Sequence, residues 1–260
     1  MAALPAGITA SVFQSRFDYG QRVLELEISN GTGAPITVTR ASFESTRFAT
    51  TAVWEGPQLI PDGSARDLRV RLTDPVCDGA APRDRIVITF TLENDRNGTA
   101  MVTPTDEQGT VDSVNAQDCL DVSVARVATI SVPAQAEWTP GARRPATIVI
   151  SVVPTGAAGT VTIHRAKGTV LLSLIAQSNS QPYDMQLESV VDATAGPSVI
   201  ALQVVPARCD PHAIEEDKRG TIFPLEVETS DGPAGTIYVA MKNEVRRSLY
   251  AFYSDYCGLP

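Results

Sequence analysis

Short segments in which hydrophobic and polar residues alternate occur along the whole chain. Residues 24–28 alternate aliphatic side chains with glutamates, and residues 86–92 and 148–152 are rich in β-branched side chains. Alternation with a period of two over four to eight residues is typical of half-buried strands. Turn-forming pairs such as Asn30-Gly31 separate these segments. The pattern predicts an all-β chain of short strands.

Two segments have a helical pattern instead. Residues 243–257 contain no Gly or Pro, their apolar side chains recur at helical spacing, and Asn243 is placed to be the N-cap. In residues 105–119, Thr105 and Gln108 have the spacing of a capping box, although Gly109 interrupts the segment. We expect a short helix in each segment.

The two halves of the chain contain similar features in the same order. An Asp follows both Cys77 and Cys209, which are 132 residues apart. The strand-like residues 68–72 precede the first of these cysteines, and residues 200–204 precede the second at the same offset. Matches that keep a common order along the chain indicate an internal repeat. We therefore interpret the chain as an internal duplication.

The repeat places a domain boundary after the first half. We expect two tandem immunoglobulin-like β-sandwich domains, 1–124 and 125–260, each with roughly seven strands and a terminal short helix. In immunoglobulin domains the disulfide spans a core Trp, but neither Trp54 nor Trp138 lies between the two cysteines of its half. The expected likeness is therefore one of architecture only.

The repeat also predicts how the cysteines pair. Four cysteines allow three connectivities. Only Cys77–Cys119 together with Cys209–Cys257 gives both halves a similar closed loop, with separations of 42 and 48 residues. Each disulfide would tie the terminal helix of a domain to the end of a strand. Paired, widely spaced cysteines are typical of an oxidising compartment.

Composition limits the classes of function. The chain has 21 basic and 30 acidic side chains and a net charge of −9, which argues against nucleic-acid binding. It has no apolar run long enough for a transmembrane segment. Its N-terminus lacks the basic and apolar regions of a signal peptide. We expect an extracytoplasmic chain, secreted or at the cell surface, whose export signal is not part of this sequence.

No common catalytic motif occurs in the sequence. Neither Gly-x-Ser-x-Gly nor His-Glu-x-x-His is present, and the only histidines are His164 and His212. We expect His164 to lie on the solvent face of a strand. The prediction is a protein that is not an enzyme and needs no cofactor, with a carboxylate-based hydrolase as the less favoured reading.

The segment from Cys209 to His212 is a candidate metal site, because Cys and His three residues apart occur in such sites. Asp210 and His212 are the metal-ligand candidates there. A site that also uses Cys257 requires reduced thiols. We favour the disulfide, because the first half keeps the cysteine pair but has no histidine near the equivalent position.

Two further features are candidates for recognition. A loop that is longer in the second half carries five charged residues in a row, and insertions on a rigid scaffold often bind partners; they are Glu215, Glu216, Asp217, Lys218 and Arg219. Helical spacing directs Tyr250 away from the other aromatic residues of its segment. Tyr250 is therefore the candidate exposed aromatic side chain.

These observations predict a non-enzymatic extracytoplasmic binding protein of tandem β-sandwich type. Its expected partner is another envelope protein, a carbohydrate polymer or a second copy of itself. The alternative is an envelope protein that binds a small ligand or a metal ion.

Overall fold

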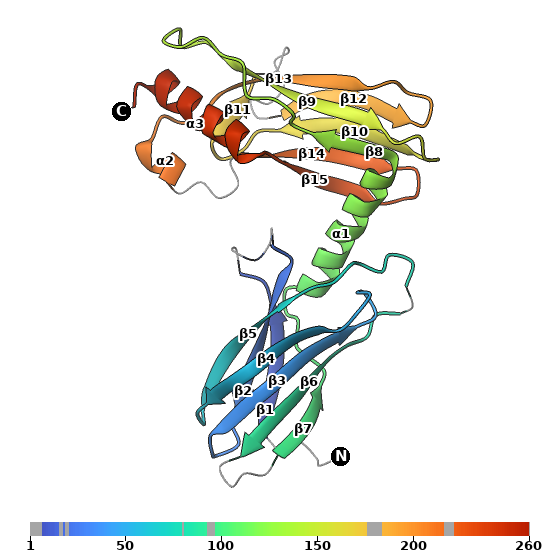
Figure 1. Ribbon diagram of the computed structural model, residues 1–260, viewed down its shortest axis with the longest axis vertical. Helices are drawn as coiled ribbons and strands as arrows, with labels where there is room; N and C mark the ends of the chain where they lie inside the picture. Colours follow the sequence, from blue (N-terminus) through green and yellow to red (C-terminus); the bar gives the residue numbers. More distant parts are fainter. Residues whose placement is uncertain are drawn as a thin grey trace. The chain divides into compact units, whose positions relative to one another are not determined.

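The computed structural model describes residues 7–15, 18, 21–79, 81–92, 97–175, 184–215 and 221–259. The chain divides into two compact units, Met1–Cys119 and Leu120–Pro260. Each unit is a sandwich of two antiparallel sheets (Figure 1). The predicted fold class of two immunoglobulin-like β-sandwiches is confirmed. Among the described residues, no helix is both long and apolar enough to cross a membrane.

The first unit packs a three-stranded sheet, β1-β2-β5, against a four-stranded sheet, β4-β3-β6-β7. The alternating residues of β2 explain this packing, because Leu24, Leu26 and Ile28 are fully buried while Glu27 faces outward. The elements are β1 (Ile8–Phe13), β2 (Val23–Asn30), β3 (Ile36–Ser45), β4 (Ala52–Ile60), β5 (Ser64–Arg71), β6 (Asp84–Leu92) and β7 (Asn97–Val102), followed by α1 (Thr110–Val127).

The second unit packs two four-stranded sheets, β11-β13-β9-β8 and β12-β10-β14-β15, around its own core. The core side chains of β9 are Ile148, Ile150 and Val152. The elements are β8 (Ala128–Ser131), β9 (Ala146–Pro154), β10 (Thr160–Lys167), β11 (Leu172–Leu174), β12 (Asp184–Asp192), β13 (Ser198–Pro206), α2 (Pro211–Glu215), β14 (Ile222–Thr229), β15 (Ala234–Ala240) and α3 (Asn243–Cys257).

The two units share one strand topology. The order β1-β2-β5 corresponds to β8-β9-β13, and β4-β3-β6-β7 corresponds to β12-β10-β14-β15. The register of β3 shifts between Val38 and Arg40, and that of β10 shifts between Ile163 and Arg165. Both irregularities therefore fall on equivalent strands of the two units. The shared topology therefore supports the predicted repeat.

The expectation of a short helix ending near Cys119 is corrected by α1, which has 18 residues. Leu120, Val124 and Val127 are buried in the second core, so the helix continues past the disulfide and the division between the units falls within it. The expected capping box is also wrong. The carboxylate of Asp106 instead accepts hydrogen bonds from the backbone N–H groups of Thr110 (2.7 Å) and Val111 (2.9 Å).

The disulfides Cys77–Cys119 and Cys209–Cys257 are both present, as predicted from the repeat. The second ties α3 to the segment that follows β13. The helix starts at Asn243 as expected, but its N-cap is Lys242, which makes no side-chain capping hydrogen bond. Asn243 therefore lies inside the helix and does not cap it.

Candidate functional site

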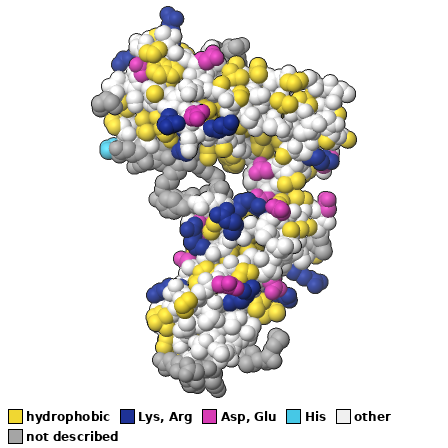
Figure 2. Space-filling view, in the orientation of Figure 1, with side chains coloured by type: hydrophobic (Ala, Val, Ile, Leu, Met, Phe, Trp, Pro, Cys, Tyr) yellow, Lys and Arg dark blue, Asp and Glu magenta, His cyan; other side chains and the backbone are white. Residues whose placement is uncertain are grey.

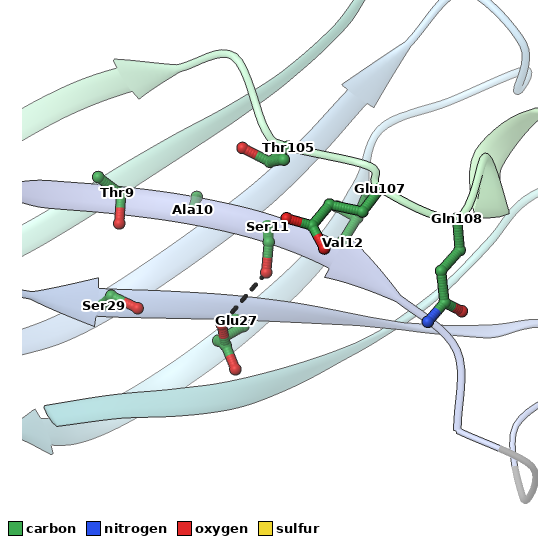
Figure 3. A pocket seen from close by; sticks show the side chains of 9 residues that line it. All are labelled: Thr9, Ala10, Ser11, Val12, Glu27, Ser29, Thr105, Glu107 and Gln108. Carbon is green, nitrogen blue, oxygen red and sulfur yellow. Dashed lines mark hydrogen bonds between the residues drawn. The ribbon is translucent and has the colours of Figure 1, made fainter.

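A polar groove of about 280 Å³ lies on the outer face of β1 and β2 in the first unit (Figure 3). The two strands form two sides of the groove, and the segment that leads from β7 into α1 forms the third side. Seven polar residues line the groove together with Ala10 and Val12; they are Thr9, Ser11, Glu27, Ser29, Thr105, Glu107 and Gln108.

Strand alternation and register bring the floor of the groove together. In the antiparallel pair β1–β2, Thr9 lies opposite Ser29 and Ser11 lies opposite Glu27. Directly opposed residues project from the same face of a sheet. Because the intervening residues of both strands face the core, the four polar side chains face outward.

The wall of the groove is held by backbone hydrogen bonds. The N–H of Val12 donates to the carbonyl of Thr105 (2.9 Å), and the N–H of Thr105 donates to the carbonyl of Ala10 (3.0 Å). This short parallel bridge fixes the segment beside the edge of β1. It thereby places Glu107 and Gln108 over the groove, with their side chains directed toward β1 and β2 in Figure 3.

The groove is rich in hydrogen-bond acceptors. The Ser11 hydroxyl donates to Oε1 of Glu27 at 3.3 Å, and Glu107 adds a second carboxylate. Asp67 lies opposite Glu27 on β5, which adds negative charge nearby. No basic or aromatic side chain occurs among the lining residues. The lining also contains no imidazole, thiol or amine that could activate Ser11, so its geometry suits binding.

A buried ionic cluster lies in the same unit but does not line the groove. Asp18 is fully buried and accepts hydrogen bonds from the N–H (2.9 Å) and hydroxyl (2.5 Å) of Ser15, and it also pairs with Arg69. Burial alone would raise its pKa, but the hydrogen bonds from Ser15 and Arg69 outweigh burial, and the pKa of Asp18 is lowered.

Glu25 completes this cluster, with its Oε1 3.2 Å from Nε of Arg69. Its pKa is raised, chiefly by burial and then by the negative charge of Asp18. Two carboxyl groups whose pKa values move in opposite directions resemble an acid–base pair. Both are nearly inaccessible, however, and share one arginine. We therefore assign them to the fold of the first unit.

His164 lies at the bulge of β10, on the outer face of its sheet as expected. Its Nδ1 is 3.1 Å from Oε2 of Glu188, and its Nε2 is 3.2 Å from Oε2 of Glu228. Hydrogen bonds to these two carboxylates raise the pKa of His164. The ring nitrogens point to carboxylates on opposite sides, so the three groups do not converge on a single point.

The candidate metal ligands do not form a cluster. Cys209 and Cys257 are disulfide-bonded, so neither offers a thiolate to a site with His212. The Oδ1 atom of Asp210 accepts a hydrogen bond from the N–H of His212 (3.0 Å), which is a turn contact. Among the described residues, no group of three or more His, Cys, Asp or Glu side chains is arranged to hold a metal ion.

Of the remaining candidates, the structure describes the backbone of Glu215 and the side chain of Tyr250. The backbone of Glu215 ends α2, whereas Glu216, Asp217, Lys218 and Arg219 lie outside the described residues. Tyr250 is not an exposed aromatic as expected. It is partly buried against the second core, and its hydroxyl accepts a hydrogen bond from Arg246 one helical turn away (3.2 Å).

The groove itself was not predicted from the sequence. Alternation in β1 and β2 could have indicated that the side chains of Thr9, Ser11 and Glu27 share an outward face. No spacing signal, however, connects them with Glu107 and Gln108, which are about 80 to 100 residues farther along the chain. The backbone bridge at Thr105 supplies that connection.

Comparison with known proteins gives distant likeness only. No protein-family model and no curated protein matches this chain. Red sea bream transglutaminase is 10% identical, with a TM-score of 0.23, over 91% of this chain and 31% of that chain. The chain therefore spans less than a third of that protein.

Two further solved structures cover more of their own length. The B domain of a biofilm associated protein is 7% identical over 88% of this chain and 83% of that chain, with a TM-score of 0.27. The CupB2 chaperone of Pseudomonas aeruginosa is 12% identical over 86% of this chain and 94% of that chain, with a TM-score of 0.23. Likeness at this level assigns no ligand, partner or activity to the chain.

Proposed function

We propose that the chain is a non-enzymatic extracytoplasmic binding protein whose first unit holds a basic segment of another envelope protein. The observation that carries this proposal is the presence of two carboxylates, Glu27 and Glu107, in one groove without a basic side chain in its lining. A ligand that brings a lysine or arginine supplies the missing positive charge.

Charge decides between a protein and a neutral carbohydrate as the ligand. Hydrogen bonds in which one partner is ionised are roughly twice as strong as neutral ones, and arginine pairs with a carboxylate in a bidentate geometry. Both groove carboxylates can form such ionised hydrogen bonds with a cationic ligand. A neutral sugar ring would gain only ordinary hydrogen bonds, and the lining offers no aromatic side chain for it to stack on.

Two features support the rest of the proposal. The two disulfides are typical of proteins from oxidising compartments, which favours an extracytoplasmic location. The groove lining combines hydroxyl, amide and carboxylate groups without an activated nucleophile, which favours binding over turnover.

Titration calorimetry with short peptides tests the proposal. We expect peptides of alternating Gly and Arg to bind, Gly-Ser peptides of equal length to bind at least tenfold more weakly, and the affinity to fall as salt is raised. The double change Glu27→Gln and Glu107→Gln should weaken binding of the basic peptide at least tenfold. The matched control is Glu137→Gln, which removes an exposed carboxylate from the second unit.

Three outcomes would contradict the proposal. A neutral oligosaccharide could bind as tightly as the basic peptide, or the double variant could bind the peptide like the parent chain. The third is a hydrolase activity that a single point substitution abolishes, which would refute the non-enzymatic assignment.

A further inference from the structure

The last strand of the first unit, β7, lies at the end of the sheet β4-β3-β6-β7 (Figure 1). Within the part of the chain that the structure describes, β7 pairs only with β6. This pairing is continuous, from Ile86 opposite Val102 to Thr91 opposite Asn97. An edge strand presents backbone N–H and C=O groups that can pair with another chain. The side of β7 that faces away from β6 is therefore an open edge.

Hydrogen bonds from β3 to β6 show how the backbone groups of β6 alternate. The hydroxyl of Ser42 donates to the carbonyl of Val87 (3.4 Å), and the hydroxyl of Thr39 donates to the carbonyl of Thr89 (3.2 Å). The carbonyls of Val87 and Thr89 therefore point toward β3. In an antiparallel sheet successive residues direct their backbone groups to opposite sides of the strand. Ile88, which lies between them, therefore directs its N–H and C=O groups to β7.

The same alternation along β7 identifies the groups at the open edge. Ala100 lies opposite Ile88, so its backbone groups face β6. Its neighbours Thr99 and Met101 direct their N–H and C=O groups away from β6. Among the described residues, no backbone hydrogen bond reaches Thr99 or Met101 from the open side. Each of these two residues therefore offers one donor and one acceptor to an added strand.

The other three edge strands of the first unit are each protected from such pairing. The edge of β1 is bridged by Thr105, and β4 contains Pro57, which has no N–H group to donate. Charged side chains line β5; they are Arg66, Asp67, Arg69 and Arg71. Covering segments, prolines and charges are the means by which proteins block edge pairing. Residues 97–102 of β7 contain neither a proline nor a charge, and no described segment pairs with their open side.

We propose that the open edge of β7 is a docking site for an extended segment of a partner protein, which adds a fifth strand to the sheet β4-β3-β6-β7. The backbone groups of Thr99 and Met101 select this occupant, because another extended backbone carries donors and acceptors at the matching spacing. A second copy of this chain is a poorer occupant, because each copy has a net charge of −9 and the two would repel one another.

The surroundings of β7 define the side chains of this segment. One uncharged row crosses all four strands; its members are Val53, Ser42, Val87 and Met101. Arg85, which contacts the sulfur of Met101, is already paired with Glu44. Figure 2 shows mainly white, uncharged surface over the lower part of the first unit, where β3 and β6 lie. Uncharged β-branched side chains pair well with such neighbours, so the segment is neutral, unlike the basic ligand of the groove.

Amide hydrogen exchange of the full chain, followed by NMR, tests the inference. The probe is an eight-residue peptide of alternating Thr and Val with uncharged ends. We expect the peptide to slow exchange at Thr99 and Met101 at least tenfold, while Gly98 and Ala100, which pair with β6, exchange slowly with or without it. The matched control is the same peptide methylated at every backbone nitrogen, which has no N–H group to donate and should slow neither residue.

Variants of one residue separate the backbone from the side chain. Thr99→Pro removes an N–H group at the open edge and leaves the hydrogen bonds with β6 in place, so it should weaken peptide binding at least tenfold. Thr99→Val keeps the N–H group and should bind the peptide like the parent chain. Circular dichroism checks that the proline variant is folded. Met101→Lys, which places a charge at an exposed position of the same strand, should also weaken binding and does not depend on tolerance of proline.

Four outcomes would overturn the inference. Thr99 and Met101 could be protected in the free chain, or the peptide could fail to slow their exchange. Both Thr99→Pro and Met101→Lys could bind the peptide like the parent. Protection could also rise with the concentration of the chain alone, which would make a second copy the occupant. The double variant Glu27→Gln and Glu107→Gln should bind the neutral peptide like the parent, so this test is independent of binding in the groove.

Discussion

The disulfide of each unit should set the thermal stability of that unit alone. Cys77–Cys119 closes a loop with a sequence separation of 42 residues, and Cys209–Cys257 closes one of 48. In the chain-entropy model, cross-links of this span stabilise the folded state by about 4 kcal/mol each, because they restrict the unfolded chain.

Other contacts keep the native helix in place when the first disulfide is removed. Nη2 of Arg22 lies 2.7 Å from Oδ2 of Asp118, next to the cysteine. The side chain of Asn115 donates to the carbonyl of Arg47 at 2.9 Å. The native state should therefore remain folded without Cys77–Cys119, and the loss should arise mainly from the unfolded state.

The expected shift follows from the size of each unit. Unfolding entropy of about 2.1 cal/mol/K per residue gives about 0.25 kcal/mol/K for the first unit, Met1–Cys119, so a loss of 4 kcal/mol lowers its Tm by about 16 °C. The same reasoning gives about 14 °C for the second unit, Leu120–Pro260.

Differential scanning calorimetry of two double variants measures both shifts. Cys77→Ala with Cys119→Ala should lower one transition, and Cys209→Ala with Cys257→Ala should lower the other, so that each variant is the control for its counterpart. Shifts below about 5 °C, or equal shifts of both transitions in one variant, would refute the reasoning.

Two further predictions concern the second unit. The buried hydroxyl of Tyr253 donates to the carbonyl of Arg208 and accepts from the N–H of Asp210 at 3.2 Å. Tyr253→Phe should therefore cost about 1–3 kcal/mol in the free energy of unfolding measured with urea. The raised pKa of His164 should be visible by NMR titration, and Glu188→Gln should lower it. Because the folded-state pKa exceeds the unfolded value, the stabilisation is complete below the unfolded pKa and is lost as pH rises through the folded pKa. An unchanged His164 pKa in the Gln variant would contradict this account.

Alternation and the repeat were enough to predict the scaffold. Period-two patterns identify strands because one side chain in two must enter the core, as Leu24 and Leu26 do. The cysteine pairing followed because equivalent strand ends recur in both halves. These features depend on local sequence or on comparison of the halves, and both are accessible without a structure.

The length of α1 could have been predicted more closely. Leu120, Val124 and Val127 recur at helical spacing, and all three are buried in the second core. That signal lies across the expected domain boundary between residues 124 and 125. A single helix that contributes to two cores breaks the assumption that each element belongs to one domain.

The groove and the charge differences between the two units arise differently from the same scaffold. The groove needs the backbone contact of Thr105 with β1, and no sequence pattern indicates such a contact. The charge differences, by contrast, follow from the repeat, because Asp67 and Arg69 align with Val199 and Ala201 at the offset of 132 residues that relates Cys77 to Cys209.

Strand register shows which residue differences between the two units lie in the core and which lie on the surface. Inward positions must stay apolar in both units to preserve the core, so differences at those positions are limited by packing. Outward positions lack this packing limit, so a change from charged to uncharged side chains there alters what the face can bind. Glu25 and Arg69 are exceptions, because they form the buried ionic cluster with Asp18. Comparing the two units position by position along β5 and β13 (Ser64–Arg71 and Ser198–Pro206) therefore separates residues that build the sandwich from residues that distinguish its surfaces.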